Sequence, residues 1–311
     1  MAVDVACLCG AYDLKEAYAD SFAAHPEITL LRPDEVRDPA RIRHALAFRP
    51  GPGAFAPFPN LELVLSGAAG VDGILSHPEL PDQVQVTRMV DDGQARMMAA
   101  FALHFITGWH RRIWDYPARA AARDWSPVNM TPPEQFTVGL LGFGNMASTL
   151  STTLRALGYQ VCAWANRPRQ VNGITVSSGA EGLRAVAGRA DALVNLLPLT
   201  PATSGLLDAN LFAQMKEGAM LIQLGRGEQL VEADLLTALA SGRPAMAAID
   251  VLAAEPPAPD NPLWDHPRVL LTPHVASMSD ERAIARTVAS AIAAFERGER
   301  PAGLVDRTRG Y

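Results

Sequence analysis

The chain has 311 residues, of which 49% are hydrophobic and 19% charged, and its formal net charge is −6. At roughly 100–200 residues per domain, this length and balance predict a globular protein of two domains. The acidic charge without a basic stripe argues against a nucleic-acid partner, and no run of about 18 apolar residues is present to span a membrane.

The N-terminus and the cysteines indicate the compartment. Asp4 stands where a secretory signal needs positive charge, and no long apolar run follows it. Cys7, Cys9 and Cys162 fit neither a zinc-binding spacing nor an even disulfide framework. We therefore expect buried structural thiols and a reducing, cytoplasmic location.

The first part of the chain alternates short apolar runs with polar helical stretches. This alternation predicts parallel strands covered by helices, the layered arrangement of an α/β fold. The Gly/Pro-rich segment Arg49-Pro50-Gly51-Pro52-Gly53 interrupts the pattern. The expected strands are 3–8, 28–31, 44–48 and 61–66, and the expected helix is 14–24.

A long helix is expected over residues 94–112. Met97, Phe101, Phe105 and Trp109 recur along it at four-residue spacing, and such a stripe is typical of core packing. A Pro-rich stretch ending at Thr131-Pro132-Pro133 then leads into the second domain. Further on we expect a helix over 231–240 that stops at Gly242, and a last helix over 280–297 capped by Ser277 or Ser279.

A phosphate-binding turn opens the second domain. The apolar strand 138–141 runs directly into Gly142-Phe143-Gly144-Asn145-Met146-Ala147, and a helical pattern continues over 147–157. In the pattern G-x-G-x-x-A the first glycine permits the tight turn, the second lets the backbone approach a pyrophosphate, and the small third residue lets helix and strand pack. The helix N-terminus then faces the phosphates, so we expect a dinucleotide cofactor.

The next strand, 159–164, indicates which dinucleotide. An NAD site places a carboxylate near this strand end to bind the ribose 2′-hydroxyl, but here Asn166, Arg167 and Arg169 follow. The two guanidinium groups would attract a 2′-phosphate. The sequence thus favours NADP(H) over NAD(H), and a solvated basic turn is the alternative.

Three charged residues follow apolar strands in the second domain. Arg226 follows the strand 221–224, Glu255 follows the strand 247–251, and His274 follows the strand 269–271. In a parallel sheet these ends share one edge with the glycine-rich turn. Each residue alone is compatible with an ordinary surface loop, but together with the cofactor turn they indicate an active site.

This set suits the reduction of a 2-oxo acid. Hydride goes to the carbonyl carbon while the oxygen takes a proton, which a histidine gives readily near neutral pH. A neighbouring carboxylate orients the imidazole and favours its charged form. A guanidinium binds the substrate carboxylate bidentately and polarises the carbonyl.

At these residues the chain resembles the D-isomer-specific 2-hydroxyacid dehydrogenases, and within them the glyoxylate/hydroxypyruvate reductase A group. The resemblance covers nearly the whole chain, and the Arg, Glu and His segments in this order are specific to the family. Segment 164–167 and the C-terminal tail are marks of the group. The resemblance to the family rests on segments 67–72, 138–147, 195–200, 224–227, 262–264, 272–276 and 305–311.

The resemblance implies a Rossmann domain for NAD(P) over 98–279, inserted into a smaller flavodoxin-like substrate domain made of 1–97 and 280–311, with the active site in the interdomain cleft. It implies that Arg226 orients the oxo acid, that His274 is the acid/base with Glu255 as its partner, and that the chain is a homodimer. Backbone N–H groups near Ala69 and Gly70 would bind the substrate carboxylate. The implied cofactor contacts are Gly142, Phe143, Gly144, Asn145, Met146, Asn166, Arg167, Leu197, Pro198, Leu224, Gly225 and Asp250.

The chain departs from the family pattern in four places. Ala147 stands in place of the third glycine of the fingerprint, a change that is tolerated. Gly225 stands where Ala or Ser is usual, and Gln223 stands where Asn is common. The segment 49–53 has an unusual composition where the group has a substrate-contacting loop. Arg49 would there admit a substrate with a second anionic group, and a solvated loop is the alternative.

Two other functions are open. An NAD-linked D-2-hydroxyacid dehydrogenase is the alternative enzyme, and the missing carboxylate after Trp164 argues against it. A non-enzymatic dinucleotide sensor, like the C-terminal-binding-protein corepressors that resemble this fold, is the alternative outside enzymes. The sequence therefore predicts an NADPH-dependent reductase of a small 2-oxo acid.

Overall fold

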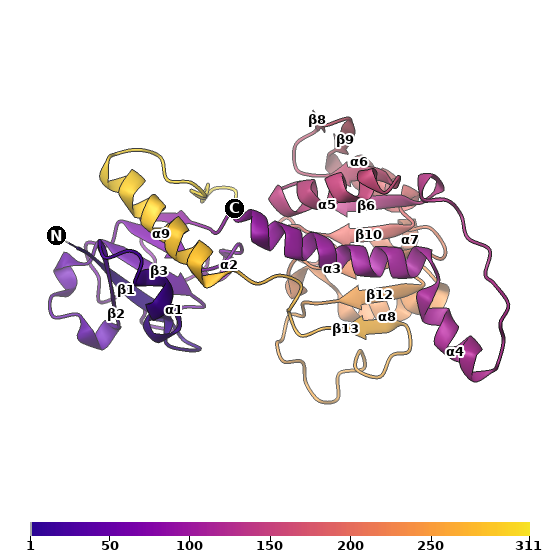
Figure 1. Cartoon of the computed structure of the whole chain (residues 1–311), viewed down its shortest axis with the longest axis horizontal. Helices are drawn as coiled ribbons and strands as arrows, with labels where there is room; N and C mark the ends of the chain where they lie inside the picture. Colours follow the sequence, from indigo (N-terminus) through magenta and orange to yellow (C-terminus); the bar gives the residue numbers. More distant parts are fainter. Residues whose placement is uncertain (1) are drawn as a thin grey trace. The chain divides into compact units, whose positions relative to one another are not determined.

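The computed structural model describes residues 2–311. The chain forms two compact units, one comprising residues up to Gly93 together with Ser279–Tyr311, the other comprising Gln94–Met278 (Figure 1). The chain thus leaves the first unit, builds the second, and returns to the first for its last helix. Sequence analysis places these boundaries at residues 97 and 280.

The first unit is built on a parallel sheet. Its strand order is β2-β1-β3-β4-β5, and every neighbouring pair is parallel. This is the flavodoxin-like order, in which the chain first winds to one side of β1 and then to the other. The strands are β1 (Val3–Cys9), β2 (Ile28–Leu31), β3 (His44–Phe48), β4 (Leu63–Ser66) and β5 (Gln85–Thr87).

Two helices cover one face of this sheet. Apolar side chains of α1 (Leu14–Phe22) and α9 (Glu281–Glu296) pack together with those of β1, β3 and β4. The opposite face packs against the loops between strands and the short helix α2 (Asp72–Leu75). The sheet is therefore buried on both faces, which explains why its strands are apolar without alternation.

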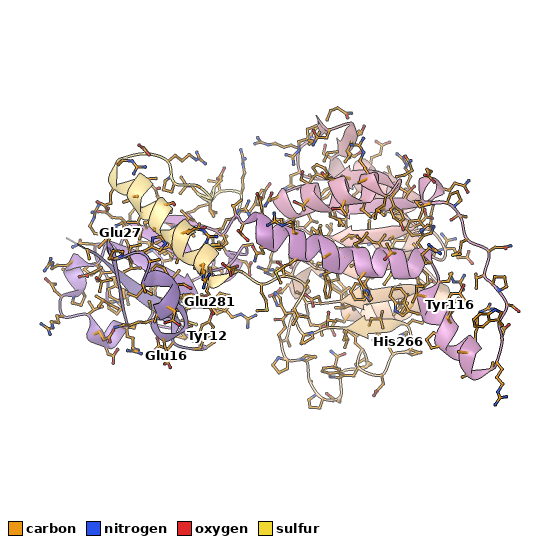
Figure 2. All side chains as sticks on the ribbon, in the orientation of Figure 1. Tyr12, Glu16, Glu27, Tyr116, His266 and Glu281 are labelled. Atoms are coloured by element: carbon orange, nitrogen blue, oxygen red, sulfur yellow. The ribbon has the colours of Figure 1, made fainter. Side chains whose placement is uncertain are left out.

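Both covering helices begin at an aspartate. Asp13 Oδ1 accepts a hydrogen bond from the backbone N of Glu16 at 3.1 Å, and Asp280 Oδ1 accepts one from the N of Ala283 at 2.9 Å. Glu16 and Glu281 lie in the first turns of α1 and α9 (Figure 2). The expected caps Ser277 and Ser279 are wrong, because the cap is the residue directly before the first helical residue.

The second unit contains the larger sheet, in the order β13-β12-β11-β10-β6-β7-β9-β8. Its pairs are parallel except for β8 with β9. The order reverses between β10 and β6, as in a Rossmann sheet. The strands are β6 (Thr137–Leu141), β7 (Gln160–Trp164), β8 (Arg169–Val171), β9 (Ile174–Ser177), β10 (Ala192–Asn195), β11 (Met220–Gln223), β12 (Met246–Ile249) and β13 (Val269–Leu271).

Helices lie on both faces of this second sheet. On one face α3 (Asp92–His110) and α5 (Asn145–Ala156) pack against it. On the other are α6 (Gly179–Arg189), α7 (Ala209–Gln214) and α8 (Glu232–Ser241). Gly242, at φ 76°, ends α8 in the left-handed conformation, as expected from the sequence. The predicted doubly wound α/β architecture is confirmed.

The expected core stripe of α3 is only partly right. Phe105 is buried, and Phe101 and Trp109 pack against the core, but the side chain of Met97 is 46% exposed. Four residues exceed one helical turn by about 40°, so a strict four-residue row drifts around the helix. Met98 takes the buried position instead.

The sequence analysis does not predict helix α4 or strands β8 and β9, and it also misses the short elements α2 and β5. The helix α4 (Tyr116–Ala121) lies in the stretch expected to be a connection. Strands β8 and β9 form a hairpin around Asn172 and Gly173, whose φ angles are 49° and 77°. Asn-Gly is the residue pair that this turn favours, so the signal was present in the sequence. Short 3-10 turns lie at Pro33–Glu35, Pro39–Arg41, Ile113–Asp115, Pro133–Gln135 and Gly227–Gln229.

The thiols are mostly structural. Burial raises the pKa of the Cys7 thiol to about 12 and also raises that of Cys162. Cys9 is only partly buried and accepts a hydrogen bond from the backbone N of Ala11 at 3.4 Å, so the expectation of full burial is wrong for this residue. Among residues 2–311, no helix combines the length and hydropathy needed to cross a membrane.

Candidate active site

One edge of the larger sheet gathers the predicted site residues of the second unit. Because its strands β6, β10, β11, β12 and β13 are parallel, their carboxyl ends lie along the same edge. Each end carries a turn with a residue that sequence analysis singled out. Gly142 follows β6, Leu197 and Pro198 follow β10, Arg226 follows β11, Asp250 follows β12, and His274 follows β13.

The turn after β6 has the shape expected of a phosphate cradle. Gly142 has φ 92°, and a Cβ there would lie 3.0 Å from the carbonyl oxygen of Leu196. A Cβ on Gly144 would meet nothing within 4 Å, so the space above this residue is open. Helix α5 begins at Asn145, and Ala147 is buried in the core beneath it. A dinucleotide pyrophosphate fits this open space beside the free N–H groups of the helix N-terminus.

The turn after β7 brings an arginine onto that cradle. Arg169 Nη2 donates a hydrogen bond to the carbonyl oxygen of Phe143, and its guanidinium carbon lies 5.9 Å from the centre of the Phe143 ring. Arg167 is exposed on the same turn. Sequence analysis expects Asn166 and Arg167 as cofactor contacts and pairs Arg169 with Arg167 near the 2′-phosphate, and in the structure Arg169 contacts the glycine turn. The β8–β9 hairpin explains this, because it folds the chain back at this point.

The Arg226 turn packs closely against the loop that carries Glu255. A Cβ on Gly227 would lie 1.8 Å from the carbonyl carbon of Leu252 and 2.1 Å from the N of Ala253, so only glycine allows this approach. Arg226 itself is half-buried, and its Nη1 donates to the carbonyl oxygen of Gly225 at 2.9 Å. The two predicted residues are thus on adjoining loops.

Glu255 and His274 are in direct contact. His274 Nδ1 lies 2.9 and 3.0 Å from the two carboxylate oxygens of Glu255. The side chains are 38% and 26% exposed, so the pair is open to a ligand without being fully solvated. With Nδ1 directed at the carboxylate, Nε2 is the ring nitrogen left to exchange a proton with a substrate.

His274 adopts an unusual backbone conformation that Asp250 supports. Its φ of 56° is left-handed, a region that residues other than glycine seldom adopt, although histidine is found there more often than most. The buried carboxylate of Asp250 accepts hydrogen bonds from Thr272 Oγ1 at 2.6 Å and from the backbone N of Val275 and of Ala276, both at 2.9 Å. The backbone N of His274 also donates to the Asp250 carbonyl at 2.8 Å. Asp250 therefore holds the turn from both sides of His274.

Three predicted substrate contacts lie in the first unit. Ala69 and Gly70 follow β4, and Arg49 follows β3, all at the carboxyl edge of that sheet. Arg49 has φ 44°, and its carbonyl oxygen accepts from the backbone N of Gly10 at 3.0 Å. Its guanidinium carbon lies 5.7 Å from the centre of the Phe48 ring. Substrate binding by these three residues stays a prediction.

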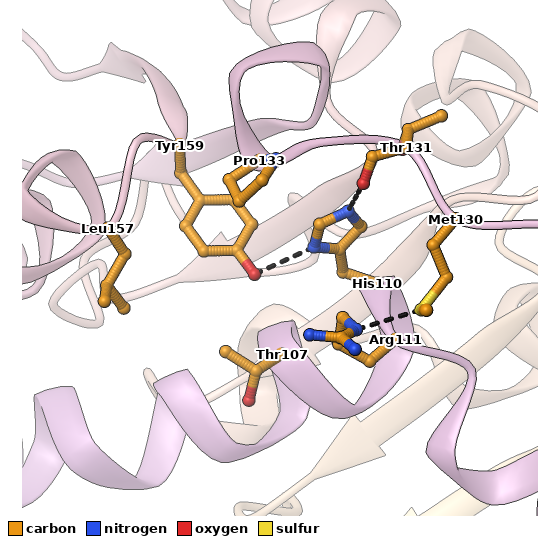
Figure 3. A pocket seen from close by; sticks show the side chains of 8 residues that line it. All are labelled: Thr107, His110, Arg111, Met130, Thr131, Pro133, Leu157 and Tyr159. Atoms are coloured by element: carbon orange, nitrogen blue, oxygen red, sulfur yellow. Dashed lines mark hydrogen bonds between the residues drawn. The ribbon is translucent and has the colours of Figure 1, made fainter.

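A pocket of about 290 Å³ lies away from this chemistry (Figure 3). Its lining comes from the end of α3 and from the segments that precede β6 and β7, at the amino edge of the sheet. His110 Nε2 donates to the carbonyl oxygen of Thr131 at 2.8 Å, and Nδ1 hydrogen-bonds with the Tyr159 hydroxyl at 2.9 Å. Both ring nitrogens are thus used within the protein, which indicates a structural histidine.

Comparisons with known proteins agree in one family. The family model for the NAD-binding domain of the D-isomer specific 2-hydroxyacid dehydrogenases matches residues 103–276. A glyoxylate/hydroxypyruvate reductase A from Serratia proteamaculans is 38% identical over 273 residues, which cover 86% of this chain and 87% of the relative.

Solved structures match over nearly the full length. A D-isomer specific 2-hydroxyacid dehydrogenase from Xanthobacter autotrophicus, in complex with NADPH and MES, is 34% identical with a TM-score of 0.93 and covers 100% of both chains. An NADPH-dependent glyoxylate/hydroxypyruvate reductase from Sinorhizobium meliloti, in complex with NADP and sulfate, is 34% identical with a TM-score of 0.90. It covers 99% of this chain and 100% of that one.

Proposed function

This chain belongs to the D-isomer-specific 2-hydroxyacid dehydrogenase family, and from that premise we propose that it is an NADPH-dependent reductase of glyoxylate, hydroxypyruvate or a similar small 2-oxo acid. The observation that carries the proposal is the contact of His274 Nδ1 with both oxygens of Glu255, at the sheet edge that also holds the glycine turn. A relative named for this activity and two NADP(H)-bound neighbours support the choice of substrate and cofactor.

His274 is the proton donor in this reaction. Glu255 accepts the hydrogen bond from Nδ1 and so orients the ring, and Nε2 carries the proton that goes to the carbonyl oxygen. Arg226 binds the carboxylate of the oxo acid and polarises its carbonyl, as a guanidinium is shaped to do. When NADPH is bound, its nicotinamide supplies the hydride for the carbonyl carbon. The products are the 2-hydroxy acid and NADP⁺, and His274 then regains a proton from solvent.

The cofactor is held by the turns after β6 and β7. The open space at Gly144 and the N-terminus of α5 suit the pyrophosphate. Arg167 and Arg169 suit the additional 2′-phosphate of NADPH, and no carboxylate stands in the segment 165–169 to repel it. Asn145, Met146, Asn166, Leu197, Pro198, Leu224 and Gly225 remain predicted contacts.

A substrate panel tests the proposal. The purified protein is mixed with NADPH or NADH and with glyoxylate, hydroxypyruvate or a dicarboxylic 2-oxo acid, and loss of absorbance of the reduced cofactor is followed. We expect turnover with the small oxo acids and a higher kcat/KM with NADPH. Binding of NADPH without turnover of any oxo acid would instead favour a dinucleotide-sensing protein, and a preference for NADH would favour the NAD-linked alternative.

The dicarboxylic substrate also tests Arg49. An Arg49→Ala variant with an unchanged preference among the three oxo acids would exclude Arg49 from binding a second anionic group. The homodimer and the cytoplasmic location are likewise predictions that rest on the sequence.

A further inference from the structure

Three side-chain amides are buried together behind the Arg226 turn. Asn195 ends β10, Gln223 ends β11, and Gln229 ends the 3-10 turn Gly227–Gln229. Each is 0% exposed. Burying an amide costs free energy unless its donors and acceptors are all paired. We therefore expect a cluster of this kind to hold a neighbouring group of the site in a fixed position.

Two of the three amides bind the backbone groups of Arg226. Gln223 Nε2 donates to the carbonyl oxygen of Arg226 at 2.8 Å, and the N–H of Arg226 donates to Gln229 Oε1 at 2.9 Å. Asn195 Nδ2 links the two glutamines by donating to Gln223 Oε1 and Gln229 Oε1, both at 2.7 Å. The backbone of Arg226 is thus fixed from two sides by groups that cannot titrate.

Gly225 leaves room for this arrangement. Its φ is not left-handed, so backbone conformation does not require a glycine here. A Cβ at this position would lie 2.3 Å from Gln229 Oε1, 2.8 Å from Asn195 Nδ2 and 2.9 Å from the Leu197 carbonyl oxygen. Gly225 and Gln223, two of the departures from the family pattern, therefore belong to one arrangement.

The same cluster reaches the turn after β10. Gln229 Nε2 donates to the carbonyl oxygens of Leu197 at 3.2 Å and Pro198 at 2.9 Å. Asn195 Oδ1 accepts from the backbone N of Leu197 at 3.2 Å. Gln229 thus also binds the turn at Leu197 and Pro198, which are predicted cofactor contacts. The Nε2 donor of Gln223, in contrast, binds only the carbonyl of Arg226.

We propose that Asn195, Gln223 and Gln229 are positioning residues for the reduction, and that Gln223 in particular sets the place of Arg226 and so the orientation of the bound oxo acid. This inference rests on the proposed role of Arg226 as the oxo-acid ligand. It adds residues that act through backbone groups of the site's turns, and of the three the donor of Gln223 acts only through the carbonyl of Arg226.

The test exchanges one amide nitrogen for an oxygen. In Gln223→Glu the side chain keeps its size and its acceptor toward Asn195 but, when ionised, loses the donor to the Arg226 carbonyl. A carboxyl in this buried position has a raised pKa, and its protonated form again offers an O–H donor. Lowering the pH should therefore restore the missing hydrogen bond.

We expect the kcat/KM for glyoxylate of Gln223→Glu to fall about 10- to 100-fold relative to wild type at about pH 8.5. At about pH 6 the ratio of variant to wild type should recover about fivefold or more. The KM for NADPH should stay within about twofold, because the donors to Leu197 and Pro198 are untouched. Comparing the variant with wild type at each pH removes from the result any pH dependence that the two proteins share.

Two further variants keep the test decisive. Gln160→Glu makes the same substitution at an exposed position of β7 and should follow wild type at every pH. Gln223→Met fills the same space without an amide and should lose kcat/KM at every pH without recovery. If circular dichroism shows that Gln223→Glu does not fold, the test rests on Gln223→Met instead.

Two results would overturn the inference. A kcat/KM for Gln223→Glu or Gln223→Met equal to wild type, with glyoxylate turnover intact, contradicts the positioning role while leaving the proposed function standing. A wild-type protein that turns over no 2-oxo acid contradicts the proposed function and the inference with it. The two failures are thus separated by the wild-type assay alone.

Discussion

Two turns at the same sheet edge hold the two groups proposed to act on the substrate, and they are built differently. The turn after β11 fixes Arg226 through two neutral amides that a third amide links. The turn after β13 fixes His274 through one buried carboxylate, Asp250, whose side-chain hydrogen bonds all come from neutral donors. Amides both donate and accept, so they can link to one another, whereas a carboxylate gathers donors around a single point.

The comparison indicates what each turn must do. Arg226 has an ordinary extended backbone, at φ −139° and ψ 146°, and needs only a fixed position. His274 is held in a left-handed conformation at φ 56°, which needs compensation from its neighbours. We therefore expect the largest loss of activity from a substitution at the β13 turn.

The largest effect is expected at the tip of the β13 turn. His274→Asn removes the proton donor, and we expect kcat to fall about a hundred- to ten-thousandfold. The affinity for NADPH, measured by nucleotide fluorescence, should not change, because the glycine turn and Arg169 are intact. A kcat within about threefold of wild type would exclude His274 as the donor.

Breaking the support of that turn should have the next largest effect. Asp250→Asn places an amide nitrogen against the N–H and O–H donors of the turn, so one side of it loses its acceptor. We expect kcat to fall about 10- to 100-fold and the free energy of unfolding to fall by about 1–3 kcal/mol. Urea denaturation measures the second quantity. Asp260→Asn, at an exposed position of the same unit, is the matched control and should change neither.

A larger side chain at position 225 tests the turn after β11, which the buried amides hold. Gly225→Ala puts a methyl group 2.3 Å from Gln229 Oε1, so the buried amides must shift. We expect the free energy of unfolding to fall by about 1–3 kcal/mol and kcat/KM for the oxo acid to fall about tenfold. Gly73→Ala, whose Cβ would meet no heavy atom within 4 Å, is the control. If Gly225→Ala and wild type have the same free energy of unfolding, the buried amides can shift without loss of stability, and the prediction is wrong.

The smallest effect is expected at a third turn on this edge, the one after β7. Arg167→Ala and Arg169→Ala should each lower the ratio of kcat/KM with NADPH to that with NADH by about five- to tenfold, since exposed charges contribute little each. The kcat/KM with NADH serves as the internal control. A ratio unchanged in both variants would remove this turn from cofactor selection.

The sequence predicts the parts of the molecule that carry local signals. The glycine turn at 142–147 and the strand ends before Arg226, Glu255 and His274 follow from short motifs and apolar runs, so their shared edge could be inferred from parallel pairing alone. The hairpin at Asn172-Gly173 also had a local signal, which the apolar pattern obscured.

The supporting contacts could not be predicted in this way. Gln223 and Gln229 are 0% exposed, but nothing in the sequence indicates that their amides meet each other and Asn195. Asp250 meets Thr272, Val275 and Ala276 only because β12 and β13 pair. Such contacts join segments far apart in the chain, and a periodicity argument compares only near neighbours.

The most direct test of the account is a crystal structure of the protein with NADPH and oxamate, an unreactive analogue of a 2-oxo acid. The account predicts His274 Nε2 at hydrogen-bonding distance, about 2.6–3.2 Å, from the carbonyl oxygen of the analogue, and the Arg226 guanidinium on its carboxylate. An imidazole directed away from the nicotinamide ring, with no room for a small acid between them, would contradict it.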